Sequence, residues 1–254
     1  MAALLEVSSI TVRFGGLTAV DGVSFGLDAG EICALIGPNG AGKTTLFNAI
    51  AGNATTDGGR IVFQGAEIQG LTPHEISARG IRRTFQTGGL FGHLTALENV
   101  LVGLHTEIAS DFFGLLLGSR RSHQAEAAAT ARAYELLALM DIADLADHPA
   151  DALSGGQQRM VEIVRALATN PPLLLLDEPA VGLAPAARDK LTAIIRRLAR
   201  ETNLGILLVE HAIELVMEVS DRVIVLNDGK KVADAPPAAV RADKAVLEAY
   251  LGHA

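Results

Sequence analysis

The chain has 254 residues, of which 49% are hydrophobic and 20% are charged, so it can bury a substantial core and is not disordered over most of its length. Lys and Arg number 21 against 29 Asp and Glu, and the formal net charge of −8 argues against a non-specific nucleic-acid binder. Aromatic residues make up 4% and Trp is absent, which argues against surfaces that stack on bases. Cys33 is the single cysteine, which excludes an intrachain disulfide framework and a cysteine-cluster metal site and indicates a reduced, intracellular setting.

The sequence carries no apolar run long enough to cross a membrane. The longest stretches, around residues 112–117 and 173–176, are far shorter than the ~20 residues of a spanning helix. The start, MAALLEVSSI, lacks the basic region and long apolar run of a secretory signal. We therefore expect a chain that is soluble or held at a membrane by a partner. We interpret FFGLLL at 112–117 as a buried helix turn rather than a docking patch.

The first third of the chain reads mostly as strands. The segment 31–37, EICALIG, is a short apolar run that ends in a glycine-rich loop, which is typical of a buried parallel strand. A helix is expected from about Gly42 to Ala51. Residues 81–86, IRRTFQ, read as a strand that passes into a loop. The other expected strands are 7–14, 23–28 and 61–63.

The next part of the sequence is mostly helical in pattern, and the alternation of strands and helices returns near Leu173. Capping boxes at Thr72 and Thr95 predict helix starts, and residues 122–140 are alanine-rich and strongly helix-forming. The later expected elements are a strand LLLLD from Leu173, a helix over 185–200, a strand over 206–209, a hairpin with an Asp228-Gly229 turn, and a short helix from about Pro237.

This order predicts an α/β core that a helical insert interrupts. The expected domain ranges are 1–86 for the first part of the α/β core, 87–153 for the helical subdomain, 154–236 for the second part of the core and 237–254 for a short C-terminal helical tail.

Residues 37–45, GPNGAGKTT, follow the expected buried strand and precede a helix. They match G-x-x-x-x-G-K-[ST] in the strand–loop–helix setting that the pattern requires. The glycines let consecutive N–H groups turn toward an anion at the helix N-terminus. Lys43 would add a positive charge at the β- and γ-phosphates, and Thr44 would offer a hydroxyl to Mg²⁺. An ordinary glycine-rich turn is the alternative.

Asp177 and Glu178 end the apolar run LLLL. The carboxyl end of a buried parallel strand faces the ligand crevice, whereas two solvated charges at a strand end are the alternative interpretation. In a phosphate site the two carboxylates suit separate tasks. Asp177 would hold Mg²⁺ through its water shell, and Glu178 would orient the attacking water or accept its proton.

The residues LSGGQQ, numbered 153–158, open a further helix pattern, and Ser154 with Gln157 forms a capping box. Alone, this segment predicts only a helix start. Together with the phosphate loop, Phe85-Gln86, LLLLDEP and a late VEH, its order and spacing resemble the ATP-binding-cassette (ABC) ATPase family over nearly the whole chain. The resemblance implies an α/β fold with a P-loop NTPase (RecA-like) core, N-terminal antiparallel β strands and an inserted α-helical subdomain.

The resemblance also implies roles for matching positions. Gln86 is similar to the loop glutamine that reaches the metal beside the transporter contact. His211 is similar to the switch histidine at the γ-phosphate, although a lone histidine is more often structural. Phe14 is similar to the aromatic residue that stacks on adenine, with a strand-core phenylalanine as the alternative. Ser154 and the residues after it resemble the signature that closes over ATP bound to a second subunit.

The expected site residues fall into three groups. The catalytic residues are Lys43, Gln86, Glu178 and His211. The nucleotide-binding residues are Phe14, Gly37, Pro38, Asn39, Gly40, Ala41, Gly42, Lys43, Thr44, Thr45, Ser154, Gly155, Gly156 and Gln157. The metal ligands are Thr44, Gln86 and Asp177.

Three softer stretches resemble the ATPases of branched-chain amino acid importers. They are ITVRFGGLTAVDGVSF, RTFQTGGLFGHLTALENVLVGLH and the tail AVLEAYLGHA. The sequence departs from the family at Ala184, where Asp or Asn is usual in the loop between subunits, and at Ala212, where an acidic residue is frequent after the histidine.

We therefore expect the ATPase subunit of an ABC importer for branched-chain amino acids, which drives transport by ATP-dependent dimer closure and hydrolysis. Its expected cofactors are ATP and Mg²⁺, and its expected location is the cytoplasmic face of the inner (plasma) membrane, as a peripheral protein. Its expected partners are transmembrane permease subunits, a second identical or paralogous ATPase subunit and, indirectly, a solute-binding protein, with no nucleic acid. Importers of urea, amides or other solutes share the softer stretches and stay open. A lipid exporter, a soluble ABC assembly ATPase and a module that binds nucleotide without hydrolysis are the further alternatives.

Overall fold

The computed structural model of the protein describes residues 3–84, 89–108 and 120–251. The chain divides into two compact units. The core unit comprises residues 1–83, 172–180 and 188–254, and the helical unit comprises residues 84–171 and 181–187. Within the described residues, no helix combines the length and the apolar character that a membrane span requires.

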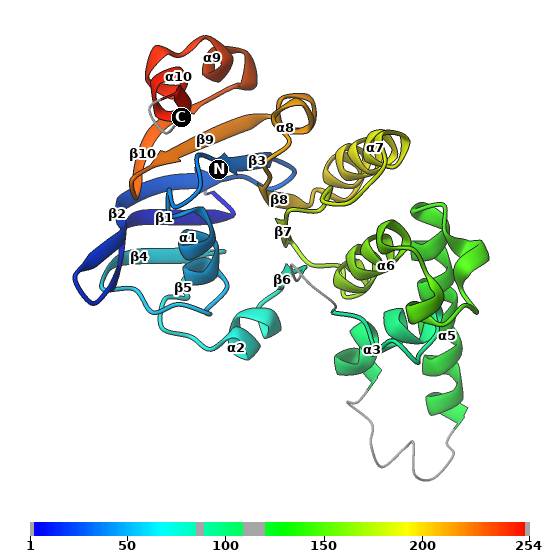
Figure 1. Ribbon diagram of the computed structural model, residues 1–254. Helices are drawn as coiled ribbons and strands as arrows, with labels where there is room; N and C mark the ends of the chain where they lie inside the picture. The colour runs from blue at the N-terminus through cyan, green and yellow to red at the C-terminus, as the bar shows by residue number, and fades with distance from the viewer. Residues whose placement is uncertain (1–2, 85–88, 109–119, 252–254) are drawn as a thin grey trace. The chain divides into compact units, whose positions relative to one another are not determined.

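The core unit contains an antiparallel sheet built from the N-terminal part of the chain (Figure 1). Buried and exposed residues alternate along much of its first strand, and the buried ones include Leu5, Val7, Ile10 and Val12, as expected for a strand with one face on a core. The strand order is β2-β1-β4-β5. The strands are β1 (Leu5–Phe14), β2 (Leu17–Leu27), β4 (Gly58–Phe63) and β5 (Ala66–Glu67).

The second sheet of the core unit has six strands in the order β10-β9-β3-β8-β7-β6. All neighbouring pairs are parallel except β9 and β10, which form the antiparallel hairpin with the turn at Asp228 and Gly229. The buried central strands are continuously apolar, as parallel strands covered on both faces are. The six strands of this sheet are β3 (Ile32–Ile36), β6 (Ile81–Arg83), β7 (Leu173–Asp177), β8 (Gly205–Val209), β9 (Arg222–Asn227) and β10 (Lys230–Ala235).

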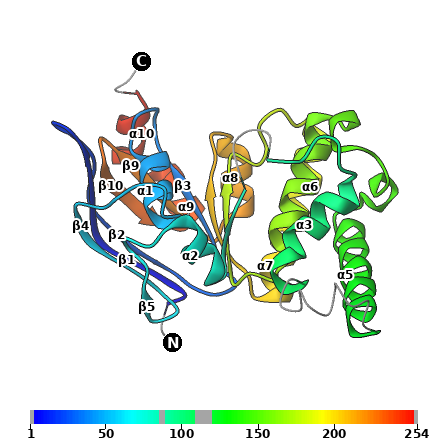
Figure 2. The same cartoon turned by 90° about the horizontal axis from the view of Figure 1, so that it is seen from below.

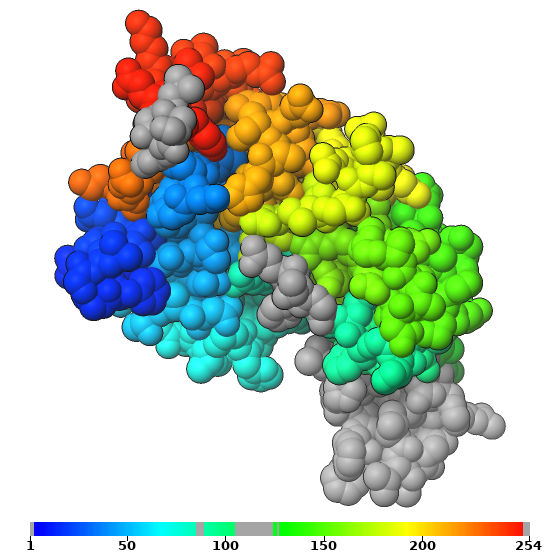
Figure 3. All heavy atoms as spheres, in the orientation of Figure 1, coloured from blue at the N-terminus to red at the C-terminus, as the bar shows by residue number. Residues whose placement is uncertain are grey.

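Apolar side chains of both sheets and of helix α1 (Lys43–Ile50) form one buried cluster. Side chains alternate between the two faces of the six-stranded sheet, so every second residue of β3 and β9 points away from this cluster to the other face. There Ile36 packs in a second cluster with Val216, Val240 and Val246, which belong to α8 (Ile213–Val219), α9 (Pro237–Ala242) and α10 (Lys244–Leu251). The tail helices α9 and α10 contact β10, and their atoms, coloured red, lie at the top of the view in Figure 3.

The helical unit is built on three helices that pack against one another (Figure 2). They are α3 (Ala96–Ile108), α5 (Arg120–Leu139) and α6 (Gly155–Leu167). Asn99 is fully buried and donates through its amide to the carbonyl groups of Phe91, Leu94 and Thr95, which ties the turn before α3 to the helix. Two single-turn helices, η2 (Ala143–Leu145) and η3 (Ala150–Ala152), connect α5 to α6.

The predicted capping boxes are present. Thr72 and Glu75 close the start of α2 (Pro73–Ala78), and Thr95 and Glu98 exchange the same two bonds at the start of α3. The fold class is confirmed. Helix α6 lies in the helical unit, whereas residues 154–236 were expected in the core. The interpretation of residues 112–117 falls outside the described residues.

Cys33 is the second residue of β3 and is fully buried. Burial raises the pKa of its thiol far above the ordinary value, because the thiolate would lose its hydration inside the sheet. The thiol therefore acts as a small apolar core group.

Leu207 tests the core unit. It is fully buried in β8, so Leu207→Ala should lower the free energy of unfolding by about 2–5 kcal/mol through lost burial and the cavity left behind. Urea titration measures the change. Leu247→Ala, at a position that is half exposed in α10, is the matched control and should leave the midpoint nearly unchanged. Equal midpoints for the two variants would contradict the described core.

Candidate functional site

The loop after β3 makes a close backbone turn that two glycines permit. Gly37 has φ +150°, and a Cβ there would lie 2.1 Å from the carbonyl oxygen of Leu226. Gly42 has φ +96°, and a Cβ there would lie 2.3 Å from the carbonyl oxygen of Ala19. No side chain fits at either position, so the glycines of the pattern are required by the packing of the loop against neighbouring strands.

Lys43 begins helix α1 and points back over the loop. Its side chain is almost entirely buried, and Nζ donates to the carbonyl oxygens of Gly37 at 2.7 Å and Pro38 at 2.9 Å. Burial lowers the pKa of the ammonium, and the nearby Glu178 carboxylate partly offsets this. An anion in the loop would favour the charged form further. The structure thus holds a cation at the helix N-terminus, where backbone N–H groups already favour negative charge.

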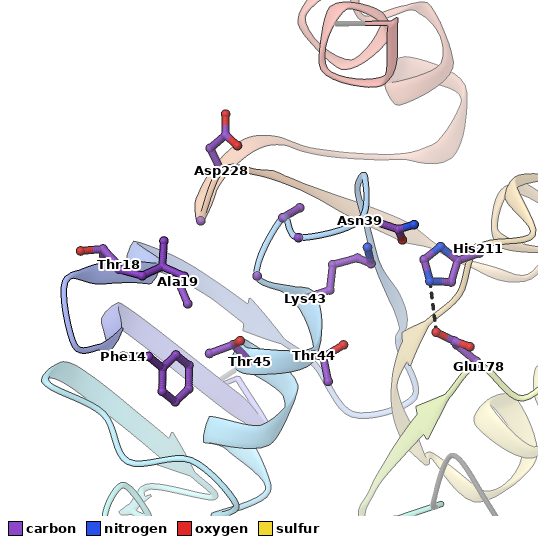
Figure 4. A pocket seen from close by; sticks show the side chains of 15 residues that line it. Phe14, Thr18, Ala19, Asn39, Lys43, Thr44, Thr45, Glu178, His211 and Asp228 are labelled. Carbon is purple, nitrogen blue, oxygen red and sulfur yellow. Dashed lines mark ion pairs between the residues drawn. The ribbon is translucent and has the colours of Figure 1, made fainter. Parts of the chain in front are cut away.

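A pocket of about 550 Å³ opens beside this loop. Figure 4 shows side chains from five separate segments of the core unit around it. Phe14 lies at its edge with 57% of its surface exposed, so the ring is not a core group and one face is available for stacking. The lining residues are Phe14, Leu17, Thr18, Ala19, Asn39, Gly40, Ala41, Gly42, Lys43, Thr44, Thr45, Glu178, His211, Asp228 and Gly229.

Glu178 and His211 meet across the pocket (Figure 4), where Oε1 of Glu178 lies 3.1 Å from Nε2 of His211. Glu178 directly follows β7 and has a φ of +46°, a conformation that residues with a side chain rarely adopt. Its N–H donates to the carbonyl oxygen of Val209 at 2.8 Å. The pair therefore sits on two adjacent loops, each of which continues a strand of the parallel sheet.

Asp177 is fully buried at the end of β7. Its Oδ2 accepts from Arg83 at 2.8 Å, and Arg83 also donates to Asn48 Oδ1 at 2.6 Å and lies over the ring of Phe47. The guanidinium is thereby fixed beside the carboxylate. A buried carboxylate at the sheet edge and the exposed hydroxyl-bearing Thr44 at the helix start are oxygen donors of the kind that Mg²⁺ takes when phosphates and water complete its shell, so these residues fit that ion.

Four predicted residues lie in the helical unit. Gln86 lies outside the described residues. Ser154, Gly155, Gly156 and Gln157 lie at the start of α6 in the helical unit. Ser154 Oγ accepts from the N–H of Gln157, and Gln157 Oε1 accepts from the N–H of Ser154 at 2.9 Å. The capping box is present, and Ser154 and Gly155 are exposed, so the helix N-terminus is accessible to an anion.

Sequence reasoning missed several contributors to the site. Leu17, Thr18 and Ala19 come from the start of β2, and Asp228 and Gly229 from the β9–β10 turn. Leu17 is 66% exposed. Its position, an apolar residue directly after the Gly15-Gly16 turn, could have indicated from the sequence that it belongs to the pocket. Arg83 stands 94 residues from Asp177, and nothing in the sequence pattern pairs them.

The arrangement suits phosphoryl transfer. A glycine-rich loop, a helix N-terminus and Lys43 provide positive potential for phosphates. Glu178 supplies a carboxylate within the same pocket that suits the orientation of water, and His211 supplies a second polar group beside it. The exposed ring of Phe14 provides a flat apolar surface at the pocket edge.

Comparison with known proteins assigns the family. The sequence profile described as ABC transporter matches residues 20–181. The chain belongs to the ABC transporter family. A second profile, described as branched-chain amino acid ATP-binding cassette transporter, matches residues 230–254. ATP-binding proteins of this family are ATPases, and the resemblance drawn from the sequence motifs is confirmed.

Full-length relatives support the assignment. The chain is 43% identical over 251 residues to the high-affinity branched-chain amino acid transport ATP-binding protein BraF of Pseudomonas aeruginosa, which covers 99% of this chain and 98% of that protein. It is 41% identical, with the same coverage, to LivG of Escherichia coli, which carries the same description. A crystal structure of a nucleotide-free ATP-binding cassette from an ABC transporter superposes with a TM-score of 0.84 at 33% identity, over 98% of this chain and 99% of that one. The ADP conformation of MJ1267, an ATP-binding cassette of an ABC transporter, gives the same TM-score and identity over 99% and 100%.

Lys43→Ala tests the phosphate loop. Removing the buried ammonium should weaken ATP binding about 10- to 100-fold, because a charge-assisted hydrogen bond contributes roughly 1.5–3 kcal/mol. Equilibrium titration with a fluorescent ATP analogue measures the affinity. Lys244→Ala removes an exposed lysine of α10 and should bind like the unchanged protein. If Lys43→Ala also bound normally, Lys43 would not contact the phosphates.

Proposed function

We propose that this ABC ATPase drives the import of branched-chain amino acids. The observation that carries the proposal is the match of the C-terminal residues 230–254 to the branched-chain amino acid cassette profile, together with full-length identity of 41–43% to BraF and LivG. A cassette matched only at its catalytic motifs would leave the transported solute open. Here the similarity extends through the tail, which carries none of the catalytic motifs.

The core-unit pocket would bind ATP, with each lining segment contacting one part of it. The phosphate loop and Lys43 would hold the triphosphate, and the exposed ring of Phe14 would stack on adenine. Thr44, Asp177 and Gln86 would hold Mg²⁺, which when bound neutralises charge on the phosphate oxygens. Arg83 beside Asp177 would keep that carboxylate oriented before the ion binds.

Glu178 would position the attacking water and accept its proton, and His211 would contact the γ-phosphate. Both side chains line the pocket and lie within 3.1 Å of each other. Glu178 has a left-handed backbone conformation, and its side chain lines the pocket beside the phosphate loop. Hydrolysis of this type requires positioning and charge stabilisation, without a covalent enzyme intermediate.

Two such subunits, identical or paralogous, would enclose two ATP molecules. The start of α6, where Ser154 and Gly155 are exposed and Gly156 follows, would cover the γ-phosphate held by the other subunit. Closure would act on transmembrane permease subunits at the cytoplasmic face of the inner membrane, and a solute-binding protein would deliver the cargo to those permeases. The transported amino acid would not touch this chain.

Glu178→Gln tests the proposed base. The variant keeps the shape of the side chain and loses its basicity, so it should bind ATP and dimerise while turnover falls by at least about 100-fold. Steady-state phosphate release and size-exclusion chromatography with ATP measure the two properties. Glu6→Gln, at an exposed position of β1, makes the same chemical change and should be silent. Normal turnover in Glu178→Gln would exclude Glu178 as the base.

Co-purification tests the transporter. A tagged full chain, expressed in its native cells and extracted with mild detergent, should bring down permease subunits, with or without a second ATPase. Untagged cells define the background. Cells without the chain should lose uptake of labelled leucine, isoleucine and valine, and Lys43→Ala should fail to restore it. Recovery of soluble partners alone would instead support an assembly ATPase, and loss of urea or amide uptake alone would reassign the cargo.

A further inference from the structure

Glu210 directly follows β8 and precedes His211, and its side chain is buried with only 2% of the residue exposed. Its Oε1 accepts from the N–H of Ala180 at 2.8 Å. Its Oε2 accepts from the N–H of His211 at 2.9 Å and of Ala212 at 3.1 Å. Three backbone donors offset the cost of burying a carboxylate, so this is a built arrangement and not a surface charge.

These hydrogen bonds join two loops of the core unit. Ala180 lies two residues after Glu178, in the loop that continues β7. His211 and Ala212 lie in the loop that continues β8. Because β7 and β8 are neighbouring parallel strands, their loops leave the sheet at the same edge. The Glu210 carboxylate spans the gap between the two loops just beyond the point where the ladder of strand hydrogen bonds ends.

Glu178 needs restraint from its surroundings. Its φ of +46° is unfavourable for a residue with a side chain and persists only where neighbouring contacts impose it. Before the turn, the N–H of Glu178 is held by the carbonyl of Val209 at 2.8 Å. After the turn, the N–H of Ala180 is held by Glu210. The turn is therefore fixed at both ends by the β8 segment.

We propose that Glu210 is a positioning residue for ATP hydrolysis: its carboxylate holds the Glu178 loop and the His211 loop in the register at which these two side chains pair. The inference rests on the proposed function, in which Glu178 and His211 act on ATP. Glu210 is not among the described residues that line the pocket. Its loss should therefore lower turnover and leave ATP affinity unchanged.

Glu210→Gln should release one of the two loops while the volume of the side chain stays almost unchanged. The amide has one oxygen acceptor and one NH₂ donor, so a donor must face either Ala180 or the pair His211 and Ala212. One loop is then released. Glu214→Gln is the matched control, because Glu214 is exposed in the first turn of α8 four residues further on and undergoes the same loss of charge.

The experiment measures turnover at saturating ATP, ATP affinity and the NMR signal of the His211 imidazole in the full chain. Glu210→Gln should lower turnover about 10- to 100-fold, since a displacement near 1 Å has this effect on positioned groups, with ATP affinity within about twofold. The His211 signal, assigned with His211→Ala, should move as it does in Glu178→Gln. Glu214→Gln should match the unchanged protein.

Three results would overturn the inference: unchanged turnover, an unmoved His211 signal, or a loss of ATP affinity as large as the loss of turnover. If Glu210→Gln does not fold, Glu210→Asp keeps the charge, is one methylene shorter and carries the same test. Normal turnover in Glu178→Gln would exclude Glu178 as the base and so contradict the proposed function. The His211 signal in Glu210→Gln would still decide whether Glu210 holds Glu178 and His211 together.

Discussion

Three parallel strands, β3, β8 and β7, end at one edge of the larger sheet, and the phosphate loop and the loops that carry Glu178 and His211 depend on that shared edge. The strand register aligns Leu35 with Val209 and Val209 with Asp177. Gly37 and His211 each stand two residues beyond this aligned row, and Glu178 stands one residue beyond it. The backbone hydrogen bonds of the sheet thus bring together a phosphate loop, a carboxylate and an imidazole that are far apart in sequence.

The sequence predicts this edge well, because the end of each strand is visible in its residue pattern. Apolar runs such as LLLL stop at a charged residue or a glycine, and the residues that follow are the candidate binding and catalytic residues. The capping boxes at Thr72, Thr95 and Ser154 are equally local, so the starts of α2, α3 and α6 were predictable. Helix α8 was not predicted, since it has only seven residues and no side-chain cap from Ala212.

Contacts between segments that are distant in the chain could not be predicted from the sequence. Arg83 meets Asp177 only because β6 pairs with β7, and no periodicity in either segment encodes that partner. Glu210 is part of the motif VEH, yet a glutamate at a strand end normally predicts a solvated charge. Its burial follows from three backbone N–H groups that two loops turn toward it, a property of the assembled sheet. The packing of both sheets with α1 in one buried cluster is likewise a contact between distant segments.

The burial of Cys33 in β3 has a practical consequence. The chain has one thiol, and that thiol is enclosed by the sheet and held in its unreactive, protonated form. Maleimide dyes and nitroxide spin labels therefore meet no competing target in the native background. A cysteine introduced on either compact unit becomes the one labelled position, so fluorescence or paramagnetic distance measurements during ATP turnover require no prior rebuilding of the core.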